Sequence, residues 1–141
     1  MLAALRLIRS EHLPTVLIVD DHAAIRIAVR DLFESSLGPI VCGEAENGAD
    51  ALLKAEELHP DLIILDLSMP VMNGFEVAKI LHDTLPSVPI FLLTAHYMEA
   101  TVQAALRIGI RAAFSKNHDL ATLVLHARDV LGRKVEPLAV P

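Results

Sequence analysis

Three carboxylates, a hydroxyl and an ammonium stand where short apolar runs end along this chain. They are Asp20 and Asp21, Asp66, Thr94 and Lys116. Carboxylates packed together repel one another, which raises their pKa values unless a cation joins them. Oxygen ligands without His or Cys favour Mg²⁺ or a similar hard ion. The set therefore predicts a metal site, provided that the fold brings these residues together.

Asp66 is the residue in this set that we predict to be the nucleophile. A metal held by two carboxylates beside a third could orient a phosphoryl group for attack by Asp66. Lys116 would neutralise phosphoryl charge, and Thr94 would donate a hydrogen bond to a phosphoryl oxygen. The chemistry that these residue types predict is phosphoryl transfer to an aspartate.

The apolar run before Asp66 predicts the element that positions it. Residues 62–65 are four consecutive aliphatics, and turn residues follow in Met69-Pro70 and Asn73-Gly74. Such a run is typical of a strand buried on both faces of a parallel sheet. The carboxyl ends of strands in open parallel sheets border the ligand crevice. Asp66 is therefore expected at that crevice.

Strand and helix patterns alternate five times from Pro14 onward. The strands are predicted over 15–19, 40–45, 62–65, 88–94 and 110–115, and the helices over 22–36, 48–58, 74–85, 97–108 and 119–131. Such alternation predicts a parallel sheet with helices on both faces and right-handed crossovers. All of the strand-end side chains should then converge on one edge.

Composition narrows the class of protein. The 141 residues suffice for one domain with a hydrophobic core, which we expect over 14–131, with a leader at 1–13 and a tail or linker at 132–141. No run approaches the roughly 18 apolar residues of a membrane span. The net charge of −6 and the scattered basic residues argue against direct nucleic-acid binding. The single cysteine, Cys42, excludes an internal disulfide and fits a cytoplasmic location.

These motifs resemble those of the receiver domain of two-component response regulators over about residues 14–131. The resemblance rests on Val19-Asp20-Asp21-His22, Leu65-Asp66-Leu67-Ser68-Met69-Pro70 with Asn73-Gly74, Thr94-Ala95, and Lys116. It implies a flavodoxin-like (βα)5 three-layer sandwich with five parallel strands in the order 2-1-3-4-5.

The resemblance also implies roles for the motif residues. Asp66 would be the phosphoacceptor. Asp21 and Asp66 would bind Mg²⁺ through carboxylates, with Asp20 binding directly or through water and Ser68 supplying its backbone carbonyl. Thr94 and Lys116 would assist a reaction that the protein catalyses only on itself, so no further enzyme activity is expected.

The resemblance implies a histidine kinase or phosphotransfer protein as the donor of the phosphoryl group. It also implies a downstream protein, or a second copy of this chain, as the partner to which the signal passes. The output face would consist of helix 97–108, strand 110–115 and helix 119–131. It would present Glu99, Gln103, Arg107 and Arg111.

Two positions depart from the family pattern. The family usually has an aromatic residue three positions before the lysine, where this chain has Ala113, which cannot act as a rotamer switch. Phe114 is adjacent, but alternation along a strand points it to the opposite face. Many relatives have proline after the lysine, whereas Asn117 here predicts a trans peptide and a differently shaped loop.

Two other functions remain open from the sequence. The Asp-Asp-His opening is common in receivers fused to helix-turn-helix domains, so the chain could be a receiver fragment of a DNA-binding transcriptional regulator. Aspartyl-phosphate phosphatases also use an aspartate at a strand end. They have a second aspartate two residues later, where this chain has Ser68, which argues against that class.

Overall fold

A five-stranded parallel sheet forms the centre of the computed structural model, which describes residues 13–69 and 71–132. The strands are β1 (Thr15–Val19), β2 (Val41–Ala45), β3 (Leu62–Leu65), β4 (Ile90–Thr94) and β5 (Ala112–Ser115). Their order is β2-β1-β3-β4-β5. The predicted flavodoxin-like topology is confirmed.

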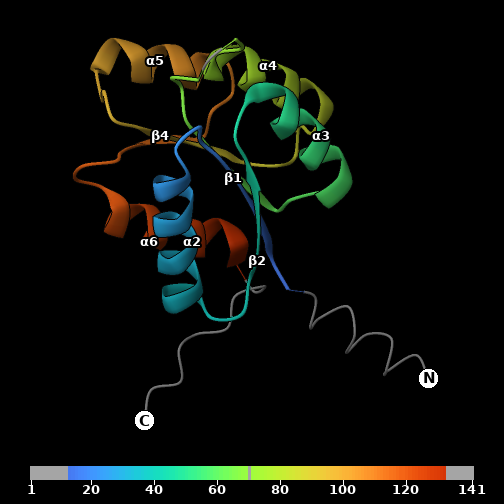
Figure 1. Ribbon diagram of the computed structural model, residues 1–141. Helices are drawn as coiled ribbons and strands as arrows, with labels where there is room; N and C mark the ends of the chain where they lie inside the picture. The colour runs from blue at the N-terminus through green and yellow to red at the C-terminus, as the bar shows by residue number, and fades with distance from the viewer. Residues whose placement is uncertain (1–12, 70, 133–141) are drawn as a thin grey trace.

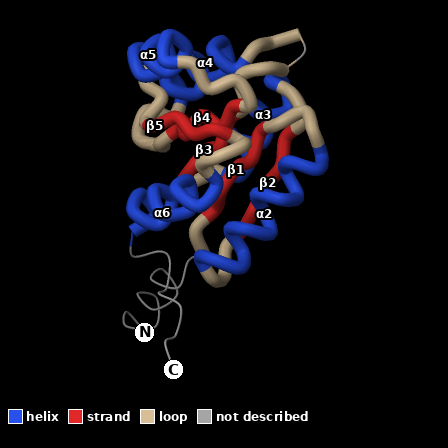
Figure 2. The backbone as a smooth tube through the Cα atoms, turned by 90° about the vertical axis from the view of Figure 1, so that its left-hand side faces the viewer, coloured by secondary structure: helices blue, strands red, loops and turns tan. Residues whose placement is uncertain are grey.

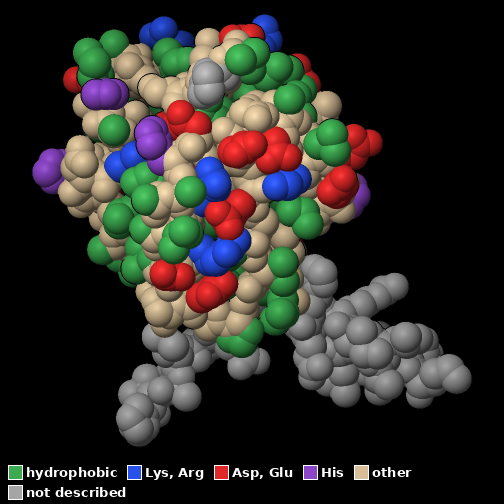
Figure 3. Space-filling view, in the orientation of Figure 1, with side chains coloured by type: hydrophobic (Ala, Val, Ile, Leu, Met, Phe, Trp, Pro, Cys, Tyr) green, Lys and Arg blue, Asp and Glu red, His purple; other side chains and the backbone are tan. Residues whose placement is uncertain are grey.

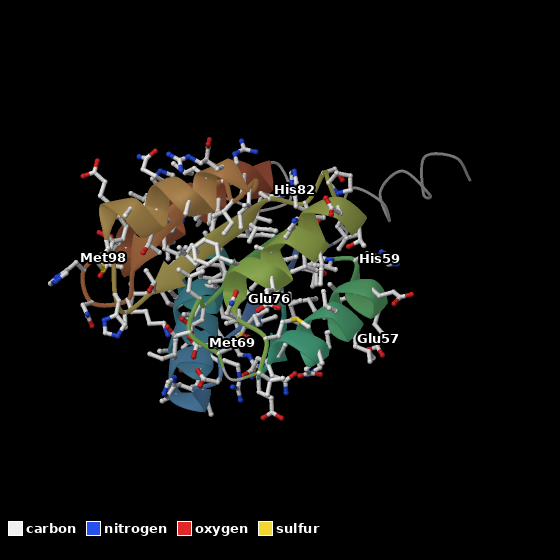
Figure 4. All side chains as sticks on the ribbon, turned by 90° about the horizontal axis from the view of Figure 1, so that it is seen from above. Glu57, His59, Met69, Glu76, His82 and Met98 are labelled. Atoms are coloured by element: carbon white, nitrogen blue, oxygen red, sulfur yellow. The ribbon has the colours of Figure 1, made fainter. Side chains whose placement is uncertain are left out.

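Helices cover both faces of the sheet, which makes three layers (Figures 1 and 2). The helices are α2 (Ala23–Leu37), α3 (Gly48–Leu58), α4 (Gly74–Thr84), α5 (Glu99–Arg107) and α6 (Leu120–Leu131). α2 and α6 pack on one face, and α3, α4 and α5 pack on the other. Figure 4 shows these three helices from above, with Met69 on the loop before α4 and Met98 next to the start of α5.

The apolar runs of the sequence explain the burial of the central strands. Every residue of β1, β3 and β4 is buried, because helices pack on both of their faces. Successive side chains alternate between two hydrophobic clusters, one centred on Phe33, Phe91 and Phe114 and the other on Leu17, Leu65 and Leu92. β2 is an edge strand and only its last residue is buried.

The predicted element boundaries hold to within two residues. Asn47 and Asn73 cap α3 and α4, and each side chain accepts a hydrogen bond from a backbone N–H three residues on. β4 begins at Ile90 rather than at residue 88, and β5 begins at Ala112 rather than at 110. α5 starts at Glu99 because the residue before it, Met98, is extended.

The predicted leader at 1–13 and tail at 132–141 lie almost entirely outside the described residues. Within residues 13–69 and 71–132, no helix has both the length and the apolar character needed to cross a bilayer.

Candidate functional site

The carboxyl ends of four strands bring the predicted residues to one edge of the sheet. Parallel pairing places Val19 beside Leu65, and the next residue, Asp66, donates its N–H to the Val19 carbonyl at 2.9 Å. On the other side Thr94 pairs with Ser115, and the N–H of Lys116 donates to the Thr94 carbonyl at 2.8 Å. The topology thus converts four separated sequence motifs into one site.

Lys116 connects the two buried carboxylates of this site. Its Nζ lies 2.6 Å from Asp20 Oδ2 and 3.5 Å from Asp66 Oδ1. Asp20 and Asp66 are only 2% and 3% exposed, so one ammonium faces two desolvated carboxylates. A single positive charge cannot balance both, which leaves the pair with excess negative charge.

The pKa of Asp66 reflects this excess of negative charge. Burial, followed by the negative charge of Asp20, raises the pKa of the Asp66 carboxyl above its ordinary value. Lys116 opposes this shift, as does the backbone N–H of Ser68, which donates to Asp66 Oδ1 at 3.3 Å. A cation added beside Asp66 would relieve the repulsion from Asp20.

His22 joins the acidic pair, which the sequence argument missed. Its Nδ1 lies 3.0 Å from Asp21 Oδ1 and 3.3 Å from Asp20 Oδ1. The ligand atoms of Asp20, Asp21 and His22 all lie within 4.8 Å of one another. The sequence predicts His22 only as the first residue of the helix over 22–36, and His22 does occupy the N-cap of α2, without a side-chain cap bond.

The donor set fits a hard divalent cation. Asp20 and Asp66 provide buried carboxylates that share the single charge of Lys116, and the more exposed Asp21 provides a third. Asp66 is not in the group of ligand atoms within 4.8 Å of one another, which consists of Asp20, Asp21 and His22. Carboxylate oxygens are the ligands that Mg²⁺ selects.

Arg26 supports the acidic loop from α2, and sequence reasoning gave no signal for it. One guanidinium nitrogen donates to the Asp20 carbonyl at 2.7 Å, and Nε donates to Glu44 Oε1 at 2.9 Å. Glu44, on β2, also pairs with Arg30. The N–H of Asp20 donates to the Ala45 carbonyl, so hydrogen bonds hold both the backbone N–H and the backbone carbonyl of Asp20. Figure 3 shows acidic and basic side chains interspersed on the face of the molecule that is turned to the viewer in Figure 1.

Thr94 is buried at the end of β4, and its Oγ1 accepts a hydrogen bond from the backbone N–H of His96 at 3.1 Å. That bond leaves the hydroxyl hydrogen available for a ligand oxygen.

Ala113 and Phe114 lie on opposite faces of the sheet, as the strand alternation predicted. Phe114 packs under α6, with its ring centroid 5.3 Å from that of Phe91 and 5.2 Å from that of His126. Ala113 packs against the cluster beneath α3, α4 and α5. Phe114 therefore does not replace the aromatic residue missing at position 113.

The predicted output face is exposed. Its exposed side chains include Glu99, Gln103, Arg107 and Arg111, together with Tyr97, Met98 and Leu106. The Lys116–Asn117 peptide is trans, as expected, since the described residues contain no cis bond.

Curated proteins similar to this chain include regulators and a longer enzyme. Transcriptional regulatory protein YdfI of Bacillus subtilis is 38% identical over 117 residues, which are 81% of this chain and 53% of that protein. Protein-glutamate methylesterase/protein-glutamine glutaminase 1 of Methanosarcina acetivorans is 39% identical over 109 residues, 74% of this chain and 31% of that protein. This chain therefore spans only about a third to a half of these two relatives.

Solved structures and the family comparison agree with this likeness. A two-component response regulator of the LuxR family from an Aurantimonas species aligns with a TM-score of 0.79 at 28% identity, covering 85% of this chain and 86% of that one. Residues 16–128 match the response regulator receiver domain family. Because that match covers most of the chain and agrees with its fold, this protein belongs to the response regulator receiver domain family.

Proposed function

We propose that this receiver domain accepts a phosphoryl group on Asp66 from the phosphohistidine of a histidine kinase or phosphotransfer protein. An Asp66 carboxylate oxygen would attack phosphorus as the P–N bond breaks. The electron pair of that bond would return to the imidazole nitrogen, which takes up a proton. The observation that carries this proposal is the buried Asp66 carboxylate beside Asp20 and Lys116 at the sheet edge.

The neighbouring side chains suit this transfer. Lys116, within 3.5 Å of Asp66, would offset the charge of the incoming phosphoryl oxygens. The Thr94 hydroxyl, whose oxygen already accepts from His96, would donate to one of them. Asp20, Asp21, Asp66 and the Ser68 carbonyl would hold Mg²⁺, which supplies further charge neutralisation for phosphoryl transfer.

The consequence of phosphorylation would be a changed protein contact. Phosphorylation adds about −1.5 to −2 charge for ordinary phosphoresidues, here next to Lys116. We assign the output to the face of α5, β5 and α6, which would contact a downstream protein or a second copy. We place the reaction in the cytoplasm and assign no catalysis beyond the protein's own phosphorylation and dephosphorylation.

Intact mass spectrometry tests the phosphoacceptor directly. The protein is incubated with acetyl phosphate, with and without Mg²⁺, as wild type, Asp66→Asn and the exposed control Asp83→Asn. We expect one Mg²⁺-dependent phosphoryl addition in wild type and Asp83→Asn, and none in Asp66→Asn. Addition to a folded Asp66→Asn variant would refute the assignment of Asp66.

A second candidate is that the chain is the receiver portion of a DNA-binding transcriptional regulator. It is favoured by the match to YdfI, of which this chain covers 53%. A longer reading frame encoding a helix-turn-helix domain, with DNA binding that changes on phosphorylation, would support this function.

A further inference from the structure

Asp119 stands at the N-cap of α6 but does not cap it. Its side chain accepts no hydrogen bond from the first turn of the helix, and its backbone, with φ −116° and ψ 16°, lies outside the extended conformation usual for this position. Asn47 and Asn73, at the same position of α3 and α4, both make the cap bond. The Asp119 carboxylate is therefore engaged elsewhere.

The carboxylate reaches back to the loop that contains Lys116. Asp119 Oδ2 accepts a hydrogen bond from the Ser115 backbone N–H at 2.8 Å, and the Asp119 N–H donates to the Ser115 carbonyl at 3.0 Å. The Asn117 N–H donates to Ser115 Oγ at 3.2 Å. Ser115 and Asp119 are thus joined by two hydrogen bonds, which close a ring of residues 115–119 that includes Lys116.

The ring determines where the lysine side chain starts. The N–H of Lys116 is bonded to the Thr94 carbonyl, so one side of this residue is held by β4 and the other by the ring. A lysine side chain has four flexible carbons, and its ammonium is placed accurately only if its backbone is fixed. The Lys116 side chain is 10% exposed, and its Nζ lies 2.6 Å from Asp20 Oδ2.

We infer that Asp119 is a positioning residue that holds Lys116 against the phosphoacceptor site through its bonds to Ser115. This inference rests on the proposed function, because the purpose of placing Lys116 is to receive the phosphoryl oxygens on Asp66. The absence of the cap bond supports it, since α6 forgoes a stabilising contact that its N-cap residue type could make. These hydrogen bonds also hold the loop after Lys116, where this chain has Asn117 in place of the proline that many relatives have.

Three substitutions separate positioning from helix capping. Asp119→Ala removes both possible interactions. Asp119→Ser retains a residue that caps as well as aspartate but is too short to bridge to Ser115 in the same way. Asp119→Asn keeps an acceptor oxygen at the same reach. Asp129→Ala, an exposed aspartate on the same helix, is the matched control.

The measurements are the rate of phosphorylation by acetyl phosphate at saturating Mg²⁺, the half-saturating Mg²⁺ concentration, and the melting temperature. For Asp119→Ala and Asp119→Ser we expect a rate about five- to tenfold below wild type, the effect of losing one positioning hydrogen bond. Asp119→Asn should recover to within about twofold of wild type. The half-saturating Mg²⁺ concentration should not rise, because a loosened Lys116 competes less for Asp20.

The alternatives give different results. If Asp119→Ser reacts at the wild-type rate, or if Asp129→Ala slows as much as Asp119→Ala, the bond from Ser115 to Asp119 does not position Lys116 and the inference is overturned. A half-saturating Mg²⁺ concentration that rises with the loss of rate would indicate general distortion of the acidic loop, and it overturns the inference too. Wild type that takes no phosphoryl group at all would instead overturn the proposed function, and the role of Asp119 with it.

Discussion

Gly74 is the glycine at which one added methyl group should disturb the site most. It is the first residue of α4, and its N–H donates to the Leu67 carbonyl at 2.9 Å. A Cβ placed on Gly74 would lie 2.4 Å from the Asp66 carbonyl oxygen and 2.6 Å from Leu67 Cα. Both of these atoms belong to the backbone, so neither can rotate away. The substitution Gly74→Ala must move Asp66 or the start of α4.

The size of the movement follows from the contact distances. Ordinary contact begins at 3.4 Å, so the Asp66 carbonyl must retreat by 3.4 − 2.4 = 1.0 Å, or α4 must shift by as much. Overpacking of this kind costs about 1–3 kcal/mol of unfolding free energy, partly offset by up to about 1 kcal/mol from the better helix propensity of alanine. A displacement of about 1 Å near reacting atoms can lower a rate by about 100-fold.

Gly43→Ala provides a matched control. Its Cβ would also meet an atom at 2.4 Å, but that atom is Leu58 Cδ1, the far end of a flexible side chain. Urea unfolding measures the stability of both variants, and phosphorylation by acetyl phosphate followed by intact mass measures their rates. We expect Gly74→Ala to lose at least about tenfold in rate and Gly43→Ala to stay within about twofold of wild type.

A Gly74→Ala variant that phosphorylates at the wild-type rate would refute this reasoning. Equal losses of unfolding free energy in the two variants would refute it too, because a rigid backbone atom should resist the added methyl group more than the mobile end of a side chain.

Two further predictions concern ionisation. Burial and the charge of Asp20 raise the pKa of Asp66 in the folded protein, so the ionised carboxylate destabilises the fold at neutral pH. This destabilisation disappears below the unfolded-state pKa of about 3.9, where Asp66 is protonated in both the folded and the unfolded protein. Asp66→Asn should therefore melt at a higher temperature than wild type at pH 7, with the difference shrinking toward pH 4; a lower melting temperature at pH 7 would contradict this. Burial, and to a lesser degree Glu34, raise the pKa of the Cys42 thiol to about 11, so only about one thiol in a thousand is ionised at pH 8. Disulfide-exchange reagents should modify Cys42 at least about 100-fold more slowly in the native protein than in urea, and equal rates would refute the shift.

The fold could be predicted from the sequence because its signals are local. The runs at residues 15–19 and 62–65 are apolar throughout, which identifies strands buried on both faces, and the helices between them have apolar stripes at helical spacing. Parallel strands end at a common edge, so the meeting of Asp20, Asp66 and Lys116 follows from the order of the elements and needs no further information. Boundaries such as the start of β4 were less accurate, because they depend on hydrogen bonds to neighbouring strands.

The supporting contacts could not be predicted in this way. The bond from Arg26 to the Asp20 carbonyl depends on how α2 lies beside the end of β1, and the approach of His22 to Asp21 depends on the path of one loop. Asp119 is the clearest case: aspartate at the start of a helix usually caps it, whereas the fold places the Ser115 N–H 2.8 Å from the Asp119 carboxylate.

The sequence by itself therefore determined which elements form, their order and the chemical types that meet at the sheet edge, since these depend on residue periodicity and on the geometry of parallel strands. The tertiary structure alone decided which side chains hold Asp20 and Lys116 in place. Those contacts involve backbone carbonyls and N–H groups, which every residue carries, so only their positions in space distinguish one partner from another.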